Sequence, residues 1–332
     1  MKFYEITIRP LSAFGTSLKG DTIFGHFCWQ VAYEPSLVNG GLEKALSQYS
    51  EKPFAVFSSA YPRFEKETVG YLLKRPDLPL SWLFPMDKES RDQRYESIKE
   101  RKKQRWMLLE QGLKIDISNI RLLSDANLVD ESRRGSDPMV SGDFLAKFLQ
   151  PHNTINRLTD TTGTGEFAPY SVEGQYYLHQ TELVLFVLID EDMISIDGII
   201  AGLDKIGRFG FGKDASTGMG RFEILDHDEL PIPETKDANA CYTLAPCVPD
   251  NCKQLYFTPF IRYGKHGDRL ATAVNPFKNP VVMADEGAVL FPDQKDSFCK
   301  PYIGRAVFNV SKAQPEAVVQ GFSPYLPMKL EH

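Results

Sequence analysis

The segment best suited to binding an anion is residues 207–222, GRFGFGKDASTGMGRF. Its five glycines can adopt positive φ and carry no Cβ, so successive backbone N–H groups can point at anionic oxygens. Arg208, Lys213 and Arg221 supply positive charge, and Ser216 and Thr217 supply hydroxyl donors. The composition predicts a loop that approaches a phosphate backbone closely, with an ordinary glycine-rich connection as the alternative.

Two nucleotide-binding motifs come close to this segment without fitting it. Residues 207–214 resemble a Walker A loop but end in Asp214, where that motif has Ser or Thr. Residues 210–215 resemble a Rossmann fingerprint. Both motifs need a strand before the loop and a helix after it, whereas here a predicted helix precedes and a strand follows. NTPase and dehydrogenase functions are therefore disfavoured.

A second polar segment, residues 151–170 (PHNTINRLTDTTGTGEFAPY), is rich in side chains that hydrogen-bond to sugars, phosphates and base edges. Arg157 is its cation, with His152 nearby, and Gly163 and Gly165 predict an exposed hairpin. A plain surface hairpin has a similar composition, so nucleic-acid contact is one of two interpretations.

His26 lies with Thr22 and Gln30 on the polar face of a predicted helix, where an RNA-cleaving enzyme could place a general base. No second histidine, tyrosine or lysine stands at a spacing that defines a catalytic partner, and no carboxylate pair has metal-ligand spacing. The five cysteines form no CxxC pair. We therefore expect no catalytic residue, metal or cofactor, and a structural His26 is the simpler interpretation.

Hydrophobic periodicity predicts the elements that position these segments. The predicted strands are residues 3–9, 53–61, 183–189 and a last one that begins near residue 221. The predicted helices are residues 21–31, with Asp21 as N-cap, and residues 196–206. The order is β-α-β, an insertion over about residues 62–180, then β-α-β, which is typical of an interrupted ferredoxin-like α+β domain.

The remaining chain divides into three parts. In the insertion, residues 91–105 carry seven Arg or Lys against three Asp or Glu, in a pattern compatible with a helix. This run is either a solvated helix face or a stripe facing RNA or a partner. Residues 224–240 are acidic and contain prolines, as expected of a connector, and a second, strand-rich domain follows.

Composition limits the mode of any nucleic-acid binding. The chain has 332 residues, 42% hydrophobic and 25% charged, with a net charge of −6. A negative net charge argues against indiscriminate coating of nucleic acid, which depends on phosphate neutralisation. No apolar run is long enough to span a bilayer and no signal pattern is present, so we expect a cytoplasmic protein without membrane contact.

Four separated segments can be compared with known families: SLKGDTIFGHFCWQ, PHNTINRLTDTTGTGEF, GRFGFGKDASTGMGRF and the C-terminal set KNPVVMADEGAVLF, GRAVFNVS and GFSPYLPM. Together they resemble the RAMP superfamily of CRISPR-associated proteins, and within it the Csm-type subunit of type III-A effector complexes that caps the 5′ end of the guide RNA. The glycine-rich loop is shared by the wider superfamily, whereas HNTINRLT and the GFSPYLPM ending are more specific.

The resemblance implies two ferredoxin-like (RRM-like) domains, residues 1–228 and 229–332, the first with the long insertion and the glycine-rich loop. It implies a non-catalytic, RNA-binding ribonucleoprotein subunit in antiviral defence. Its expected partners are the 5′ handle of the crRNA, the large multidomain effector subunit and a backbone RAMP subunit. The RNA-binding residues that it suggests are Lys19, His26, His152, Asn153, Asn156, Arg157, Thr159, Arg208, Lys213, Ser216, Thr217, Met219 and Arg221.

Two alternatives stay open, because a fold does not determine a function. One is a metal-independent endoribonuclease that processes CRISPR transcripts, with His26 as its base. The other is the counterpart subunit of a type III-B complex, which would have the same RNA role and different neighbours.

Overall fold

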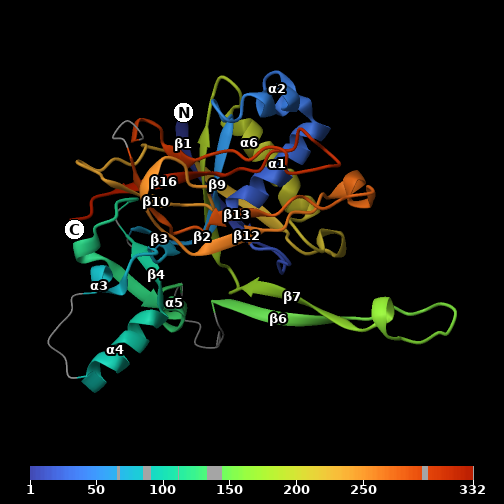
Figure 1. The fold of residues 1–332 in the computed structure, drawn as a ribbon, viewed down its shortest axis with the longest axis horizontal. Coiled ribbons are helices and arrows are strands. Elements are labelled where there is room, and N and C mark those ends of the chain that lie inside the picture. Colours follow the sequence, from blue (N-terminus) through green and yellow to red (C-terminus); the bar gives the residue numbers. More distant parts are fainter. Residues whose placement is uncertain (66–67, 85–90, 111, 133–143, 294–297, 332) are drawn as a thin grey trace.

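The protein combines helices with antiparallel sheets in a mixed α+β architecture, as the sequence predicts (Figure 1). The computed structural model describes residues 1–65, 68–84, 91–110, 112–132, 144–293 and 298–331. Among these residues, no helix has the length and apolar character needed to cross a membrane.

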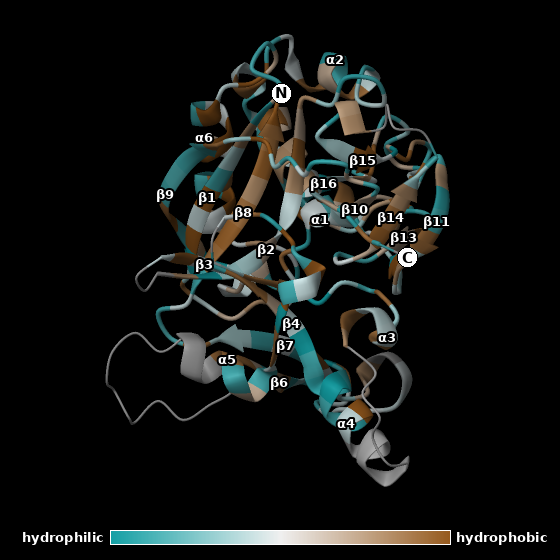
Figure 2. Ribbon diagram, turned by 90° about the vertical axis from the view of Figure 1, so that its left-hand side faces the viewer, coloured by the Kyte–Doolittle hydropathy of each residue, from teal (hydrophilic) through white to brown (hydrophobic). Residues whose placement is uncertain are grey.

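The larger sheet has seven strands in the spatial order β5-β4-β3-β2-β8-β1-β9. Its strands are β1 (Lys2–Pro10), β2 (Ala55–Glu65), β3 (Val69–Lys74), β4 (Gln104–Leu109), β5 (Arg121–Ser124), β8 (Glu182–Ile189) and β9 (Phe222–Leu230). Strand β8 lies between β1 and β2, is buried at every position, and appears apolar along its length in Figure 2. A continuously apolar strand is expected where a sheet is covered on both faces.

Helices α1 (Gly20–Tyr33) and α6 (Ile196–Phe209) pack on this sheet and on each other, with α2 (Gly41–Ser47) against α1. Both long helices were predicted from their apolar spacing. The prediction of Asp21 as the N-cap of α1 is wrong: Lys19 occupies the cap position without a side-chain cap bond, and Arg262 binds the Asp21 carboxylate. Helix α6 is capped by Ser195, whose hydroxyl accepts from the Gly198 N–H at 3.2 Å.

The chain between β2 and β8 extends the sheet with β3–β5 and adds separate elements at one end of the molecule (Figures 1 and 2). These elements are α3 (Leu80–Leu83), α4 (Arg91–Lys103), α5 (Asp125–Ser132), β6 (Leu145–His152) and β7 (Tyr170–Tyr177). The predicted basic helix is α4. Strands β6 and β7 form a hairpin that projects away from both sheets (Figure 1), which confirms the predicted exposed hairpin.

The second sheet has five strands in the order β11-β14-β10-β16-β15, and β12 pairs with β13 beside it. The strands of this sheet are β10 (Ala240–Thr243), β11 (Cys252–Tyr256), β14 (Val289–Pro292), β15 (Tyr302–Gly304) and β16 (Phe322–Met328), and the separate pair is β12 (Pro259–Arg262) and β13 (Val281–Ala284). This part is strand-rich, as predicted. The described residues after α6 contain no α-helix, so this part does not show the two helices of a ferredoxin-like domain.

Residues of both sheets contribute to one large hydrophobic core. Tyr49 and Phe322, from opposite sides of the junction, pack with ring centroids 5.7 Å apart. Fully buried Gln320 bonds both backbone groups of Phe57, donating to its carbonyl at 2.7 Å and accepting from its N–H at 2.9 Å. These bonds supply hydrogen-bond partners to the β2 backbone where the pairing of β2 with β8 is irregular, between Phe57 and Ala60.

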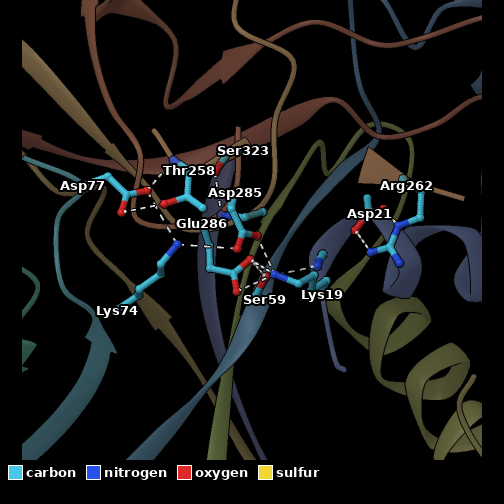
Figure 3. Close-up of polar contacts among 12 residues, drawn as sticks. Lys19, Asp21, Ser59, Lys74, Asp77, Thr258, Arg262, Asp285, Glu286 and Ser323 are labelled. Carbon is cyan, nitrogen blue, oxygen red and sulfur yellow. Dashed lines mark hydrogen bonds and ion pairs between the residues drawn. The ribbon is translucent and has the colours of Figure 1, made fainter. Parts of the chain in front are cut away.

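A partly buried ionic cluster also joins the N-terminus of α1 to the turn that follows β13 (Figure 3). The Lys19 ammonium lies 2.5 Å from Asp285 Oδ1 and 2.6 Å from Glu286 Oε2. Beside it, the Arg262 guanidinium donates two hydrogen bonds to the Asp21 carboxylate, at 2.5 and 2.8 Å. Burial opposes the charge on Lys19, but the two carboxylates outweigh that effect and raise its pKa. We call Lys19, Asp285 and Glu286 the junction cluster.

Candidate nucleic-acid interface

The glycine-rich loop joins α6 to β9, as the sequence predicts, and its shape depends on left-handed glycines. Gly210, Gly212, Gly218 and Gly220 have φ of 102°, 76°, 94° and 74°. The loop closes on itself, because the N–H of fully buried Phe211 donates to the Gly220 carbonyl at 2.9 Å. A Cβ on Gly220 would lie 2.1 Å from the Phe211 carbonyl oxygen, so only glycine fits there.

His26 on α1 anchors this loop. Its Nε2 accepts a hydrogen bond from the Gly212 N–H at 3.1 Å, and its ring lies 4.7 Å from that of Phe211. Burial, and then the nearby charge of Lys278, lowers the pKa of His26 to about 4, so the imidazole is neutral at pH 7. A neutral imidazole has one lone pair, and here the loop uses it. This engaged lone pair argues against the interpretation of His26 as a general base, and the hydrogen bond ties the loop to α1.

The segment between β1 and α1 holds the other side of the loop. Thr16 Oγ1 accepts from the Lys213 N–H, and Ser12 Oγ accepts from the Arg221 N–H, both at 2.9 Å. On the side of this segment that faces away from the loop, Phe14 exchanges two backbone hydrogen bonds of 2.9 Å with Gln175 of β7. Residues 12–16 therefore connect the glycine-rich loop to the base of the projecting hairpin.

The loop presents charged and polar side chains to solvent. Lys213, Ser216, Thr217 and Arg221 are exposed, and Met219 is half-buried. Within the described residues, neither Lys213 nor Arg221 has an ion-pair partner. Their charges are thus available to an anion beside a backbone that side chains hold in place. Such an arrangement can contact phosphates.

Arg208 and Phe209 end α6 at the start of this loop. Arg208 is exposed and pairs with Asp204 at 2.9 Å, so its charge is partly compensated. Phe209 is 73% exposed, although large aromatic side chains are usually buried. An exposed ring beside cations is suited to stacking on a base. Sequence reasoning missed Phe209; its position between an arginine and the first loop glycine was the available signal.

The hairpin candidates are divided between structural and exposed roles. The His152 ring stacks on Tyr170, with centroids 5.3 Å apart and planes 10° from parallel, and its buried Nε2 has no partner in the described chain. Asn156 shapes the turn, since its Oδ1 accepts from the Leu158 N–H at 2.9 Å. The exposed candidates are Asn153, Arg157 and Thr159.

The structure does not bring all the candidates together. The residues after His152 follow the end of β6, at the end of the hairpin far from the sheets and the glycine-rich loop (Figure 1). Lys19 is also separate, because Asp285 and Glu286 hold its ammonium and its side chain is only 14% exposed. The Lys19 ammonium is therefore engaged in ion pairs within the chain, and its expected phosphate contact stays a prediction.

No protein-family model matches this sequence, and no curated protein matches it. Solved structures do. A chain of the Csm1-Csm4 cassette in complex with cA4 aligns over 100% of both chains, with a TM-score of 0.54 and 18% identity. A chain of the Csm3-Csm4 subcomplex in the type III-A CRISPR-Cas interference complex aligns over 99% of this chain and 100% of that chain, with a TM-score of 0.55 and 15% identity. Over its whole length, the chain therefore has the fold of Csm4, the subunit common to these two crystal structures.

Proposed function

We propose that this chain is a non-catalytic, RNA-binding subunit of a type III-A CRISPR-Cas (Csm) interference complex and binds the 5′ handle of the crRNA. The observation that carries the proposal is the glycine-rich loop, which offers Lys213, Arg221 and Ser216 on a backbone held by His26 and Thr16. Positioning RNA requires donors and cations on a rigid support, and no activated nucleophile.

The topology of the larger sheet supports a RAMP domain. Strands β1, β2, β8 and β9 lie in the order β2-β8-β1-β9 with antiparallel neighbours, and α1 and α6 follow β1 and β8 in the chain. This is the β-α-β-β-α-β arrangement of a ferredoxin-like domain. We assign the RAMP domain to about residues 1–228, with β3–β7 as its insertion.

The proposed partners follow from the complexes that share this fold. The matched crystal structures pair Csm4 with Csm1 in one case and with Csm3 in the other. We propose that this chain docks likewise to a large multidomain subunit and to a backbone RAMP subunit, in antiviral defence. The projecting β6–β7 hairpin, with Asn153, Arg157 and Thr159 exposed near its end, supports a second RNA contact distant from the loop.

The proposal is tested by binding labelled guide RNA, with and without its handle, alone and with the two partner subunits. We expect handle-dependent binding without cleavage. In Lys213→Gln/Arg221→Gln the slope of log affinity against log salt should fall by about one for each phosphate contact removed. Lys253→Gln, which changes an exposed lysine on β11, is the matched control and should bind normally.

Two results would reject the proposal. Binding that ignores the handle even with partners present would remove the capping role. Metal-independent cleavage of repeat RNA that is lost in His26→Ala would instead make the chain a processing enzyme, although the engaged Nε2 of His26 argues against that result.

A further inference from the structure

A pocket of about 250 Å³ lies on the outer face of α1, between α2 and the chain segments 266–278 and 314–318. Its walls are mainly apolar. They include Cys28, Trp29, Leu42, Leu46, Leu270 and Val318. The volume suits a ligand about the size of one nucleotide or smaller, because drug-sized ligands occupy pockets of roughly 300–1,000 Å³.

Lys278 lines this pocket as a cation without a partner. Its backbone N–H donates to the Gly264 carbonyl at 2.8 Å, and its side-chain carbons pack beside Gly264. Its ammonium has neither an ion pair nor a hydrogen bond within the described part of the chain, whereas comparably buried Lys19 has two carboxylates. Burial lowers the pKa of Lys278 accordingly. A largely buried cation is normally paired.

The groups around Lys278 do not compensate its charge. Asp21 is near enough to act on it electrostatically, but that carboxylate is already bound by Arg262. His266 Nε2 is held by Ser311 Oγ at 2.7 Å, and burial, with the charge of Lys278, lowers the pKa of His266. Glu43 and Glu316 line the pocket without reaching ion-pair distance of the ammonium. The pocket thus has a place for an external anion.

The aromatic side chain in the pocket wall indicates which chemical group is attached to the anion. Trp29 is steadied by a stacking contact with Tyr33, with centroids 6.0 Å apart, and lines the same pocket as Lys278. A cation together with an indole and aliphatic walls suits a phosphate attached to a flat apolar body. We propose that this pocket binds one nucleoside monophosphate unit, with Lys278 pairing its phosphate and the base packing on the Trp29 side.

This site is separate from the glycine-rich loop and goes beyond the proposed handle binding. The unit could be a free mononucleotide or one nucleotide of the bound RNA. The two sources share the chemistry, and competition between AMP and guide RNA distinguishes them. If RNA displaces AMP, the RNA supplies the nucleotide; if AMP still binds the RNA-loaded protein, the ligand is free. Both results require that AMP binds.

Calorimetric titration of the full chain with AMP, adenosine and inorganic phosphate tests the proposal. Adenosine should bind at least about tenfold more weakly than AMP, because it lacks the charge-assisted bond. Lys278→Met should lose AMP binding with an unchanged melting temperature, and Lys265→Met, which changes a neighbouring exposed lysine that lies over Phe277, should keep it.

Three outcomes would overturn the site: no AMP binding, equal affinity for AMP and adenosine, or full AMP binding by Lys278→Met. If Lys278→Met proves unstable, Lys278→Arg keeps the charge and Trp29→Leu removes the aromatic wall; AMP affinity unchanged in Trp29→Leu would equally overturn it. Lys213→Gln/Arg221→Gln should bind AMP normally, so failure of the handle-binding role is distinguishable from failure of this site.

Discussion

Replacing Lys19 with methionine separates a structural lysine from an RNA-binding one. The sequence places Lys19 among the RNA-binding candidates, whereas in the fold its ammonium lies 2.5 Å from Asp285 and 2.6 Å from Glu286. Methionine has a similar length and no charge, so it removes the ion pairs with little change in packing. We therefore expect Lys19→Met to lower the free energy of unfolding, with weaker RNA binding only as a consequence of unfolding.

The magnitude follows from what the variant leaves behind. Removing one partner of a buried ion pair costs about 3–5 kcal/mol, because the other charge stays buried without compensation. Asp285 keeps a second cation, Lys74, at 3.5 Å. Burial already raises the pKa of Glu286, which would take up a proton once Lys19 is gone. Because of both effects, we expect Lys19→Met to lower the free energy of unfolding by about 3 kcal/mol, the lower end of that range. The whole free energy of unfolding of a protein is typically about 5–15 kcal/mol.

Urea unfolding at pH 7 measures this loss. The double variant Lys19→Met/Glu286→Gln should recover part of it, because the uncompensated carboxylate is removed. Lys213→Met is the matched control: its side chain is exposed, so stability should change by less than about 0.5 kcal/mol while RNA affinity falls. The reasoning is refuted if Lys19→Met unfolds like the wild type and yet binds RNA weakly.

Three further predictions concern the glycine-rich loop. Gly220→Ala should lower the free energy of unfolding by about 2–4 kcal/mol in urea, and Gly218→Ala by about 1 kcal/mol. Both glycines have positive φ, but only a Cβ at Gly220 would collide with backbone atoms. Equal losses of stability in the two variants would contradict the loop geometry. The pKa of His26 in the folded protein, about 4, lies below its ordinary value near 6.5. The stability that is present above pH 6.5 should therefore fall as the pH decreases toward 4. Unfolding measured at about pH 7 and about pH 5 should show a smaller difference in His26→Gln than in the wild type. Phe209→Ala should weaken RNA binding by about 1–3 kcal/mol in a titration with unchanged stability; a loss of stability instead would make Phe209 structural.

Local patterns in the sequence predicted the elements that need no distant partner. The apolar run of β8 and the helical spacing of apolar residues in α1 and α6 each indicate which side chains are buried. This is because the spacing of apolar residues along a segment reflects its own backbone geometry. The glycine-rich loop was predictable for the same reason, because left-handed φ angles favour glycine at particular positions. Gly163 and Gly165 likewise indicated the hairpin turn.

Partners far apart in the sequence could not be predicted in this way. Lys19 and Glu286 are 267 residues apart, and Gly212 reaches His26 across 186 residues. Both Lys19 and His26 lie in a segment that resembles an RNA-binding family, so their charge and polarity predict RNA contacts. In the fold each of these side chains also has a partner within the chain, which the local sequence does not indicate.

Helix α1 links the two parts of the molecule on which the proposed function depends. Its N-terminal end is bound to the β12–β13 region through Lys19 and Asp21, and one turn further along His26 holds Gly212 of the glycine-rich loop. The position of the loop therefore depends on how the sheets dock. This arrangement reconciles a net charge of −6 with the proposed RNA binding: carboxylates compensate Lys19 inside the junction cluster, whereas Lys213 and Arg221 keep their charge on the exposed loop. The site at which such a chain binds a phosphate backbone depends on where cations without a carboxylate partner lie, more than on the net charge of the chain.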